Sequence, residues 1–144
     1  MENKKVQFFY QQVRFSFLKR NTLKLFIETL FIAEKKKLQH LNVIFCTDEA
    51  LLAINKRFLN HNYNTDIITF PLSSKGQAIE AELYISVDRV KENAKKQGTR
   101  FSTELHRVLF HGCLHLTCYN DKSSQQIKRI REREDHYLRL YFHK

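Results

Sequence analysis

The order of apolar and polar positions along the chain predicts strands and helices that alternate in its first half. Two segments, "VQFFY" (6–10) and "LNVIFCT" (41–47), have the composition of strands. The second is apolar at consecutive positions, as expected for a central strand buried on both faces. Between them lies a helix with Asn21 or Thr22 as N-cap, running into "EKKK", whose cations suit a C-terminal dipole. Its apolar positions recur at helical spacing: Leu23, Phe26, Ile27, Leu30 and Phe31. A second helix, capped by Thr47 or Asp48, follows through "EALLAINKRFL".

The second half of the chain predicts a hairpin followed by three helices. The segments "DIITFPL" (66–72) and "ELYISV" (82–87) are predicted strands, joined in hairpin fashion by the polar turn "SSKGQ". Asp88 can open a helix that Gly98 ends, and 103–117 is expected to be a largely buried helix. Ser123 and Gln126 have the spacing of a capping box. The last helix has one apolar stripe, made of Ile127, Ile130, Tyr137 and Tyr141.

Strands and helices mixed in this way indicate an α+β fold. We expect one domain over 1–144, with a mixed sheet of about four strands covered by helices. The chain is long enough to bury a substantial core, and the metal site considered below would lie at the end of the buried helix.

Composition adds information on location and partners. The net charge is +10, and it is unevenly placed. Residues 1–40 hold nine Lys/Arg and three Asp/Glu, residues 122–144 hold seven and three, and residues 41–121 hold nine of each. Solvated helix faces account for each charge run separately, but the sum favours a polyanionic partner such as nucleic acid. We expect a cytoplasmic protein that has no membrane partner. The three cysteines lack framework spacing, no secretory signal is found, and no apolar run approaches the ~20 residues of a membrane span.

The candidate chemistry lies in "FHGCLHLTCYND" (110–121). On a helix, His111 and His115 are one turn apart on one face and can bind one ion. Asp121 follows the predicted helix end, where a turn can bring its carboxylate back as a third ligand. Three protein ligands and an open fourth position are typical of catalytic zinc, so we expect one divalent ion, with zinc as first choice. Cys118 is a rival for the third ligand, since it shares the face of His111 if the helix continues.

The histidine spacing also occurs in zinc proteases of the metzincin class. Those enzymes place a glutamate directly after the first histidine and a methionine turn downstream. Here Gly112 occupies the first position, and the only methionine is Met1. A protease is therefore the weaker interpretation.

The segment resembles more closely the signature H-G-x-L-H-L-x-G-Y-D-H of the YbeY family of bacterial endoribonucleases and ribosomal RNA maturation factors. The shared positions are His111, Gly112, Leu114, His115, Leu116 and Tyr119; Cys118, Asn120 and Asp121 replace Gly, Asp and His. A second family segment, P-T-D-V-L-S-F-P, is similar to "NTDIITFPL", "AELYIS" (81–86) resembles the family strand G-D-I-x-I-S, and Glu104-Leu105 resembles its R-E-L.

The resemblance implies an α+β fold, a metal ion at the three signature positions and RNA as substrate. It assigns His111 and His115 directly as metal ligands. At the third ligand position Asp121 replaces the family's histidine and offers an oxygen ligand. Two departures stand out. The family commonly has Y-R where this chain has Phe58-Leu59, and such an arginine suits phosphate, so Lys56 or Arg57 is considered as its substitute. Cys118 replaces a glycine in the turn, where a positive φ would disfavour a side chain.

The resemblance and its departures leave two functions open. The first is a metal-dependent, single-strand-specific endoribonuclease acting in ribosomal RNA maturation (the 16S 3′ end) and ribosome assembly, with small-subunit components as partners. The second is a non-catalytic assembly or RNA-binding factor with a structural metal, which the loss of the family arginine at Leu59 favours. No catalytic residue beyond the metal ligands is predicted.

Overall fold

The computed structural model describes residues 5–15 and 19–143, which form one mixed four-stranded sheet and five helices. The strands are β1 (Val6–Tyr10), β2 (Leu38–Cys46), β3 (Ile67–Pro71) and β4 (Ile79–Ser86). Their order is β1-β2-β4-β3. Neighbours β1, β2 and β4 run parallel, and β3 pairs antiparallel with β4 as the edge of the sheet. The predicted α+β class, the four strands and the β3–β4 hairpin are confirmed.

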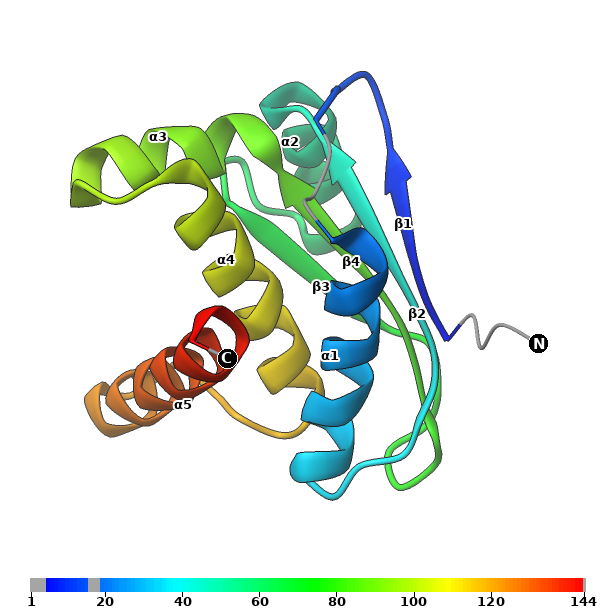
Figure 1. The fold of residues 1–144 in the computed structure, drawn as a ribbon. Coiled ribbons are helices and arrows are strands. Elements are labelled where there is room, and N and C mark those ends of the chain that lie inside the picture. Colours follow the sequence, from blue (N-terminus) through cyan, green and yellow to red (C-terminus); the bar gives the residue numbers. More distant parts are fainter. Residues whose placement is uncertain (1–4, 16–18, 144) are drawn as a thin grey trace.

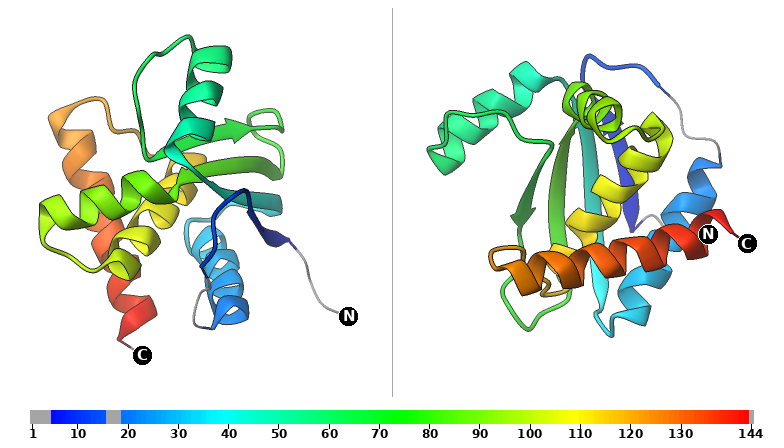
Figure 2. Two further views of the ribbon diagram at one scale, coloured as in Figure 1. Left: turned by 90° about the horizontal axis from the view of Figure 1, so that it is seen from above. Right: turned by 90° about the vertical axis from the view of Figure 1, so that its left-hand side faces the viewer.

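Helices cover the sheet on both faces but unequally (Figures 1 and 2). One face carries α1 (Arg20–Ala33) and α4 (Phe101–Leu116), with α5 (Ser124–Phe142) packed on the outside of α4. The other face carries α2 (Asp48–Leu59), whose buried Leu51 packs with Cys46 and Ile68 in a small second cluster. Helix α3 (Val87–Gln97) continues directly from β4 and packs against α4. Most of the core therefore lies between α1, α4 and the inner face of the sheet.

Strand β2 is central, as its consecutive apolar residues predicted. It pairs with β1 on one side and β4 on the other, and its last four residues, 43–46, are buried. The strand begins at Leu38, three residues before the predicted start, because parallel pairing with Ile79 extends its first residues. In β4, Leu83 and Ile85 are buried in the core.

Three helices begin at side-chain caps. Thr47 accepts from the amide of Ala50, and Ser123 with Gln126 forms the predicted capping box of α5. The predicted cap of α3 was wrong: Ser86 caps the helix by accepting from the amide of Arg89. Asp88 lies in its first turn and instead accepts from the amide of Asp48.

The bounds of α1 also differ from the prediction. The helix begins at Arg20 after Lys19, which has a left-handed backbone (φ 60°), so neither Asn21 nor Thr22 is the cap. It ends at Ala33 with Glu34 as C-cap, and the three lysines at 35–37 therefore lie beyond the helix rather than in its last turn. These lysines form the turn into β2.

Helix α4 is largely buried, as predicted, and it crosses the inner face of the sheet. Gly112 lies directly against the sheet: a Cβ there would lie 2.6 Å from Cδ1 of Ile67 and 3.0 Å from Cδ1 of Leu83. On α5 the predicted stripe holds for Ile130 and Tyr137, which are buried, while Ile127 is 52% exposed. The glycine sets α4 close to β3 and β4, one residue from His111.

Candidate metal centre

The two histidines lie in the last turns of α4, and Asp121 lies in the connection to α5. His111 and His115 are neighbours on one helix face, with ring centroids 4.6 Å apart and planes at 81°. The helix ends at Leu116 with Thr117 as C-cap, and Cys118 then takes a left-handed backbone with φ 85°. That turn reverses the chain and brings Asp121 to the histidines. The three predicted residues are thus brought together.

Three ligand-type atoms converge at this point. Nε2 of His115 lies 3.0 Å from Nε2 of His111, and Oδ2 of Asp121 lies 3.3 Å from His115 Nε2 and 3.4 Å from His111 Nε2. Two ligands that each lie about 2.0–2.1 Å from a tetrahedral zinc ion are about 3.3 Å apart. The observed separations match this requirement, and the three residues are recognised as a group able to hold a metal ion.

Glu134 of α5 fixes the orientation of the first histidine. Its Oε2 lies 2.5 Å from Nδ1 of His111, so the Nδ1–H donates to the carboxylate and the lone pair of Nε2 faces the other two ligands. The other oxygen of Glu134 accepts from Arg107 at 3.0 Å, and Arg107 also donates to Asp135 at 2.6 Å. A carboxylate behind a ligating histidine is the usual support of a metal site, because it sets the tautomer and raises the basicity of the ligand.

The surrounding charges act on two ionisable groups at the site. Burial alone would lower the pKa of His111, but the hydrogen bond and charge of Glu134, with Asp121 and Asp66, raise it above its ordinary value. Burial raises the pKa of the Asp66 carboxyl, against the opposing effects of His111 and of backbone amides. The carboxylates of Glu134, Asp121 and Asp66 thus favour a positive charge at the position of His111.

Cys118 does not join the three ligands. Its side chain is exposed and lines the same groove, but the ligand group found among residues 5–15 and 19–143 consists of His111, His115 and Asp121. The helix ends before Cys118, so the continued helical face that made it a rival does not exist. The geometry favours the carboxylate as the third ligand.

The structure also explains why the glutamate of the zinc proteases is missing. Position 112 faces Ile67 and Leu83 of the sheet, and even a Cβ would meet their side chains. A glutamate at 112 would have to displace the packing of α4 on the sheet. The interpretation as a metzincin-type protease is therefore disfavoured by the fold as well as by the sequence.

Sequence reasoning missed Glu134 and Arg107. A signal was present: Ile130, Glu134, Tyr137 and Leu138 share one helical face, and a carboxylate on an otherwise buried stripe has to be paired. Glu134 is 3% exposed. What the sequence did not contain was its partner, because α4 and α5 meet only in three dimensions.

A second set of contacts holds the connection that carries Asp121. The hydroxyl of Tyr119 donates to Glu34 at 3.0 Å, Arg133 donates to the same carboxylate at 2.8 Å, and Tyr137 donates to it as well. Burial would raise the pKa of Glu34, but these donors, Tyr137 first, lower it below its ordinary value. Glu34 therefore links the end of α1, the connection after α4 and helix α5.

The centre opens into a groove of about 1090 Å³ that runs along the edge strand β3. Leu59, which stands in place of the family arginine, is 41% exposed on its wall. Lys56 and Arg57, the predicted substitutes, are not among the residues that line it, and Arg57 packs over the ring of Phe58. The cations that do line the groove are Lys35, Lys36, Lys37 and Lys75.

The mixed sheet, the buried helix α4 and the three convergent ligands define a small α+β protein. Its histidine–carboxylate centre lies beside a groove that is lined by these four lysines and by the acidic residues Asp66, Glu80 and Asp121. Residues 2–141 match the family model described as "Endoribonuclease YbeY". The chain belongs to the YbeY family, which confirms the resemblance found in its motifs.

Individual relatives agree with this assignment. The chain is 42% identical over 140 residues to the endoribonuclease YbeY of Cytophaga hutchinsonii, covering 97% of this chain and 98% of that protein. It is 41% identical over 115 residues to that of Flavobacterium psychrophilum, covering 80% and 81%. A Thermotoga maritima protein of known solution structure superimposes with a TM-score of 0.60 at 26% identity, over 93% of this chain and 87% of that one. Among the described residues, no helix is long and apolar enough to cross a membrane.

Proposed function

We propose that this chain, as one domain over 1–144, is a metal-dependent endoribonuclease specific for single-stranded RNA. Membership of the YbeY family supports RNA cleavage, and the convergent ligand atoms of His111, His115 and Asp121 support the metal. The observation that carries the proposal is this ligand group at the wall of a lysine-lined groove. We further propose 16S ribosomal RNA 3′-end maturation and ribosome assembly as its role, with small-subunit components as partners and the cytoplasm as its location.

His111, His115 and Asp121 would hold one divalent ion, with zinc suited to two imidazoles and a carboxylate. When bound, the ion supplies Lewis-acid polarisation of a phosphoryl oxygen and lowers the pKa of a bound water. The protein contributes orientation: Glu134 holds the Nδ1 proton of His111, and Arg107 fixes Glu134. A glutamate base at position 112 would meet the side chains of Ile67 and Leu83, so the attacking water or 2′-hydroxyl of the RNA would be activated without a base at that position.

The first test concerns the third ligand. Asp121→Asn keeps the size of the side chain but removes its charge, so zinc affinity should fall more than about tenfold. Cys118→Ala is the matched control, since it removes the rival ligand from the same turn and should leave affinity unchanged. Calorimetric titration with zinc measures both. Unchanged affinity in Asp121→Asn, with loss in Cys118→Ala, would assign the third position to the thiol.

The alternative function is a ribosome-assembly factor with a structural metal, favoured by Leu59 at the position of the family arginine. His115→Ala separates the two. For an enzyme, it should abolish cleavage of a labelled ribosomal RNA fragment, because the ion stabilises charge at phosphorus, while the melting temperature of the zinc-free protein stays near that of zinc-free wild type. For a structural metal, zinc should raise the melting temperature of wild type by several degrees without any cleavage. Undetectable cleavage by zinc-loaded wild type would rule out the enzyme.

A further inference from the structure

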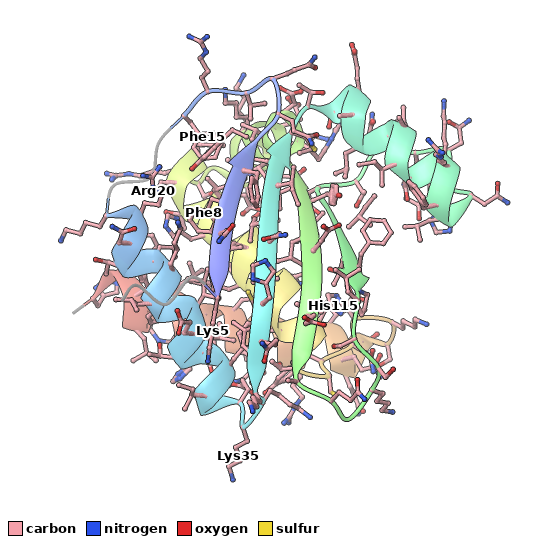
Figure 3. All side chains as sticks on the ribbon, turned by 90° about the vertical axis from the view of Figure 1, so that its right-hand side faces the viewer. Lys5, Phe8, Phe15, Arg20, Lys35 and His115 are labelled. Carbon is pink, nitrogen blue, oxygen red and sulfur yellow. The ribbon has the colours of Figure 1, made fainter. Side chains whose placement is uncertain are left out.

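The groove beside the metal centre has two ends of different chemistry. At one end lie the turn between α1 and β2, with Lys35, Lys36 and Lys37, and the β3–β4 hairpin with Lys75. Figure 1 shows both connections at the same end of the sheet, and Figure 3 places Lys35 there. The connection from α2 to β3, which contributes His61 and Tyr63 to the lining, lies at the opposite end of β3 from the hairpin (Figure 2). The centre and strand β3 lie between them.

At the lysine end, hydrogen bonds hold the backbone of the turn, and the lysine side chains are exposed. The amide of Lys36 donates to the carbonyl of Phe31 at 2.9 Å, and the carbonyl of Lys37 accepts from Ile79 at 2.8 Å. All three side chains at 35–37 are exposed, and no ion pair found among the described residues engages them. Fixed backbone and unpaired ammonium groups suit contacts with phosphates.

The opposite end presents an aromatic surface. The rings of Tyr63 and His61 stack with centroids 5.1 Å apart and planes at 19°, and the hydroxyl of Tyr63 lies 2.9 Å from Nδ1 of His61. Tyr63 is nevertheless 56% exposed. Proteins that bind single strands combine exposed aromatic rings, on which nucleobases stack, with cationic groups that contact the backbone.

The fold holds this surface in place. The buried Asn55 donates from Nδ2 to the carbonyl of Tyr63 at 2.9 Å, and its own carbonyl accepts from the amide of His61 at 3.1 Å. Asn55 is 1% exposed and comes from α2, so the connection is anchored at both aromatic residues. A surface that is fixed before binding loses less entropy when a ligand stacks on it.

We propose that the groove binds one strand of RNA at two points on either side of the metal centre. Bases stack on Tyr63, supported by His61, and phosphates bind Lys36 and Lys37 at the other end. This inference rests on the proposed function and assigns the residues that hold its substrate. It also accounts for the leucine at position 59: phosphate is bound across the groove by the lysine turn instead of by an arginine on α2. A duplex would hide the base faces that Tyr63 needs, so the groove selects single strands.

The first test measures binding without cleavage. A fluorescent oligoadenylate of about ten nucleotides, within the usual site size, is titrated with zinc-free protein in chelator. Tyr63→Ala should weaken binding about 5- to 150-fold, the value of one base stack, and Tyr63→Phe should retain wild-type affinity. An abasic oligomer of equal length should bind wild type and Tyr63→Ala equally. Equal loss on both oligomers, or no loss on either, would overturn the stacking role.

The second test measures the lysine end through its salt dependence. Lys36→Gln with Lys37→Gln should reduce the log–log salt slope by about 1.4, at about 0.7 per contact. The control is Lys95→Gln with Lys96→Gln on α3, which removes the same charge away from the groove and should leave the slope almost unchanged. Equal effects of the two pairs would overturn the site. Both tests measure binding alone, and cleavage is measured in the separate experiment described above. A protein that passes both binding tests but does not cleave RNA contradicts the enzymatic function alone. A protein that cleaves RNA but fails both binding tests contradicts this inference alone.

Discussion

Cys118 has a backbone conformation that its side chain disfavours. Its φ of 85° is in the left-handed region, where the Cβ of a non-glycine residue crowds the following carbonyl at about 1–2 kcal/mol. The chain needs this conformation because the turn after α4 has to bring Asp121 back to the histidines. A glycine would make the same turn without strain.

Cys118→Gly should therefore stabilise the protein. Relief of the left-handed strain exceeds the added entropy of the unfolded chain, about 0.4–1 kcal/mol, so we expect a net gain of about 0.5–1 kcal/mol. Urea unfolding of the zinc-free protein measures it. Cys118→Ala is the control, since it removes the thiol and keeps the Cβ, and it should gain nothing. If both variants gained equally, the thiol and not the backbone would be the cause.

At the scale of elements, α4 and α5 together make the metal centre. The ligands come from α4 and the turn after it, and Glu134, which orients His111, comes from α5. Arg107 crosses the same interface to Glu134 and to Asp135. The packing angle of the two helices therefore sets the direction of the first ligand.

Glu134→Gln should weaken zinc binding by about 10- to 100-fold, because the neutral amide no longer raises the basicity of His111. The matched control is Asp135→Asn. Asp135 binds the same arginine, but its side chain is 42% exposed, and within residues 5–15 and 19–143 it forms no hydrogen bond or ion pair with the histidine, so its loss should change affinity little. Zinc titration by calorimetry gives both values. A similar loss in the two variants would mean that the helix interface, rather than the histidine contact, governs affinity.

The elements were predictable where a local signal exists. Thr47 and the pair Ser123 and Gln126 cap their helices through atoms three residues away, and the apolar run of β2 marks its central place. The candidate ligands were found for the same reason: all three lie within eleven residues, on one helix and its following turn.

Features set by distant parts of the chain were missed. Strand β2 is extended at Leu38 by pairing with Ile79 of β4. The lysines at 35–37 have the pattern of a helix end but form a groove wall. The role of Glu134 depends on the packing of α5 against α4. The spacing of residues along each helix does not show that these two helices are partners.

At the scale of the whole molecule, Glu34 connects the end of α1, in the first half of the chain, with α5 and the segment before it in the second half. It accepts from Tyr119 beside the metal centre and from Arg133 and Tyr137 on α5, and its side chain is 10% exposed. Burial would raise its pKa, but these donors lower it below the ordinary value of 4.5. The charged form is therefore favoured more in the folded state than in the unfolded state.

This shift predicts a pH dependence of stability. A lowered folded-state pKa gives stabilisation that is fully present above the unfolded pKa and is lost as the pH falls through the folded one. The difference in unfolding free energy between wild type and Glu34→Gln should thus be constant from pH 7 to about pH 5.5 and shrink below about pH 4.5. Urea unfolding across this range tests it, with Glu92→Gln, an exposed carboxyl on α3, as control. A difference that stays constant down to pH 3 would contradict the lowered pKa.

The three cysteines differ sharply in how they can react. Cys46 and Cys113 are buried, and burial raises the pKa of Cys46 to about 11 and that of Cys113 further still, so both stay protonated at neutral pH. Only the thiolate is a nucleophile, and Cys118 is exposed within the groove. An alkylating reagent should therefore modify the unaltered protein at a single place, beside the metal centre. The rate of that one reaction reports whatever fills the groove, without any engineered label.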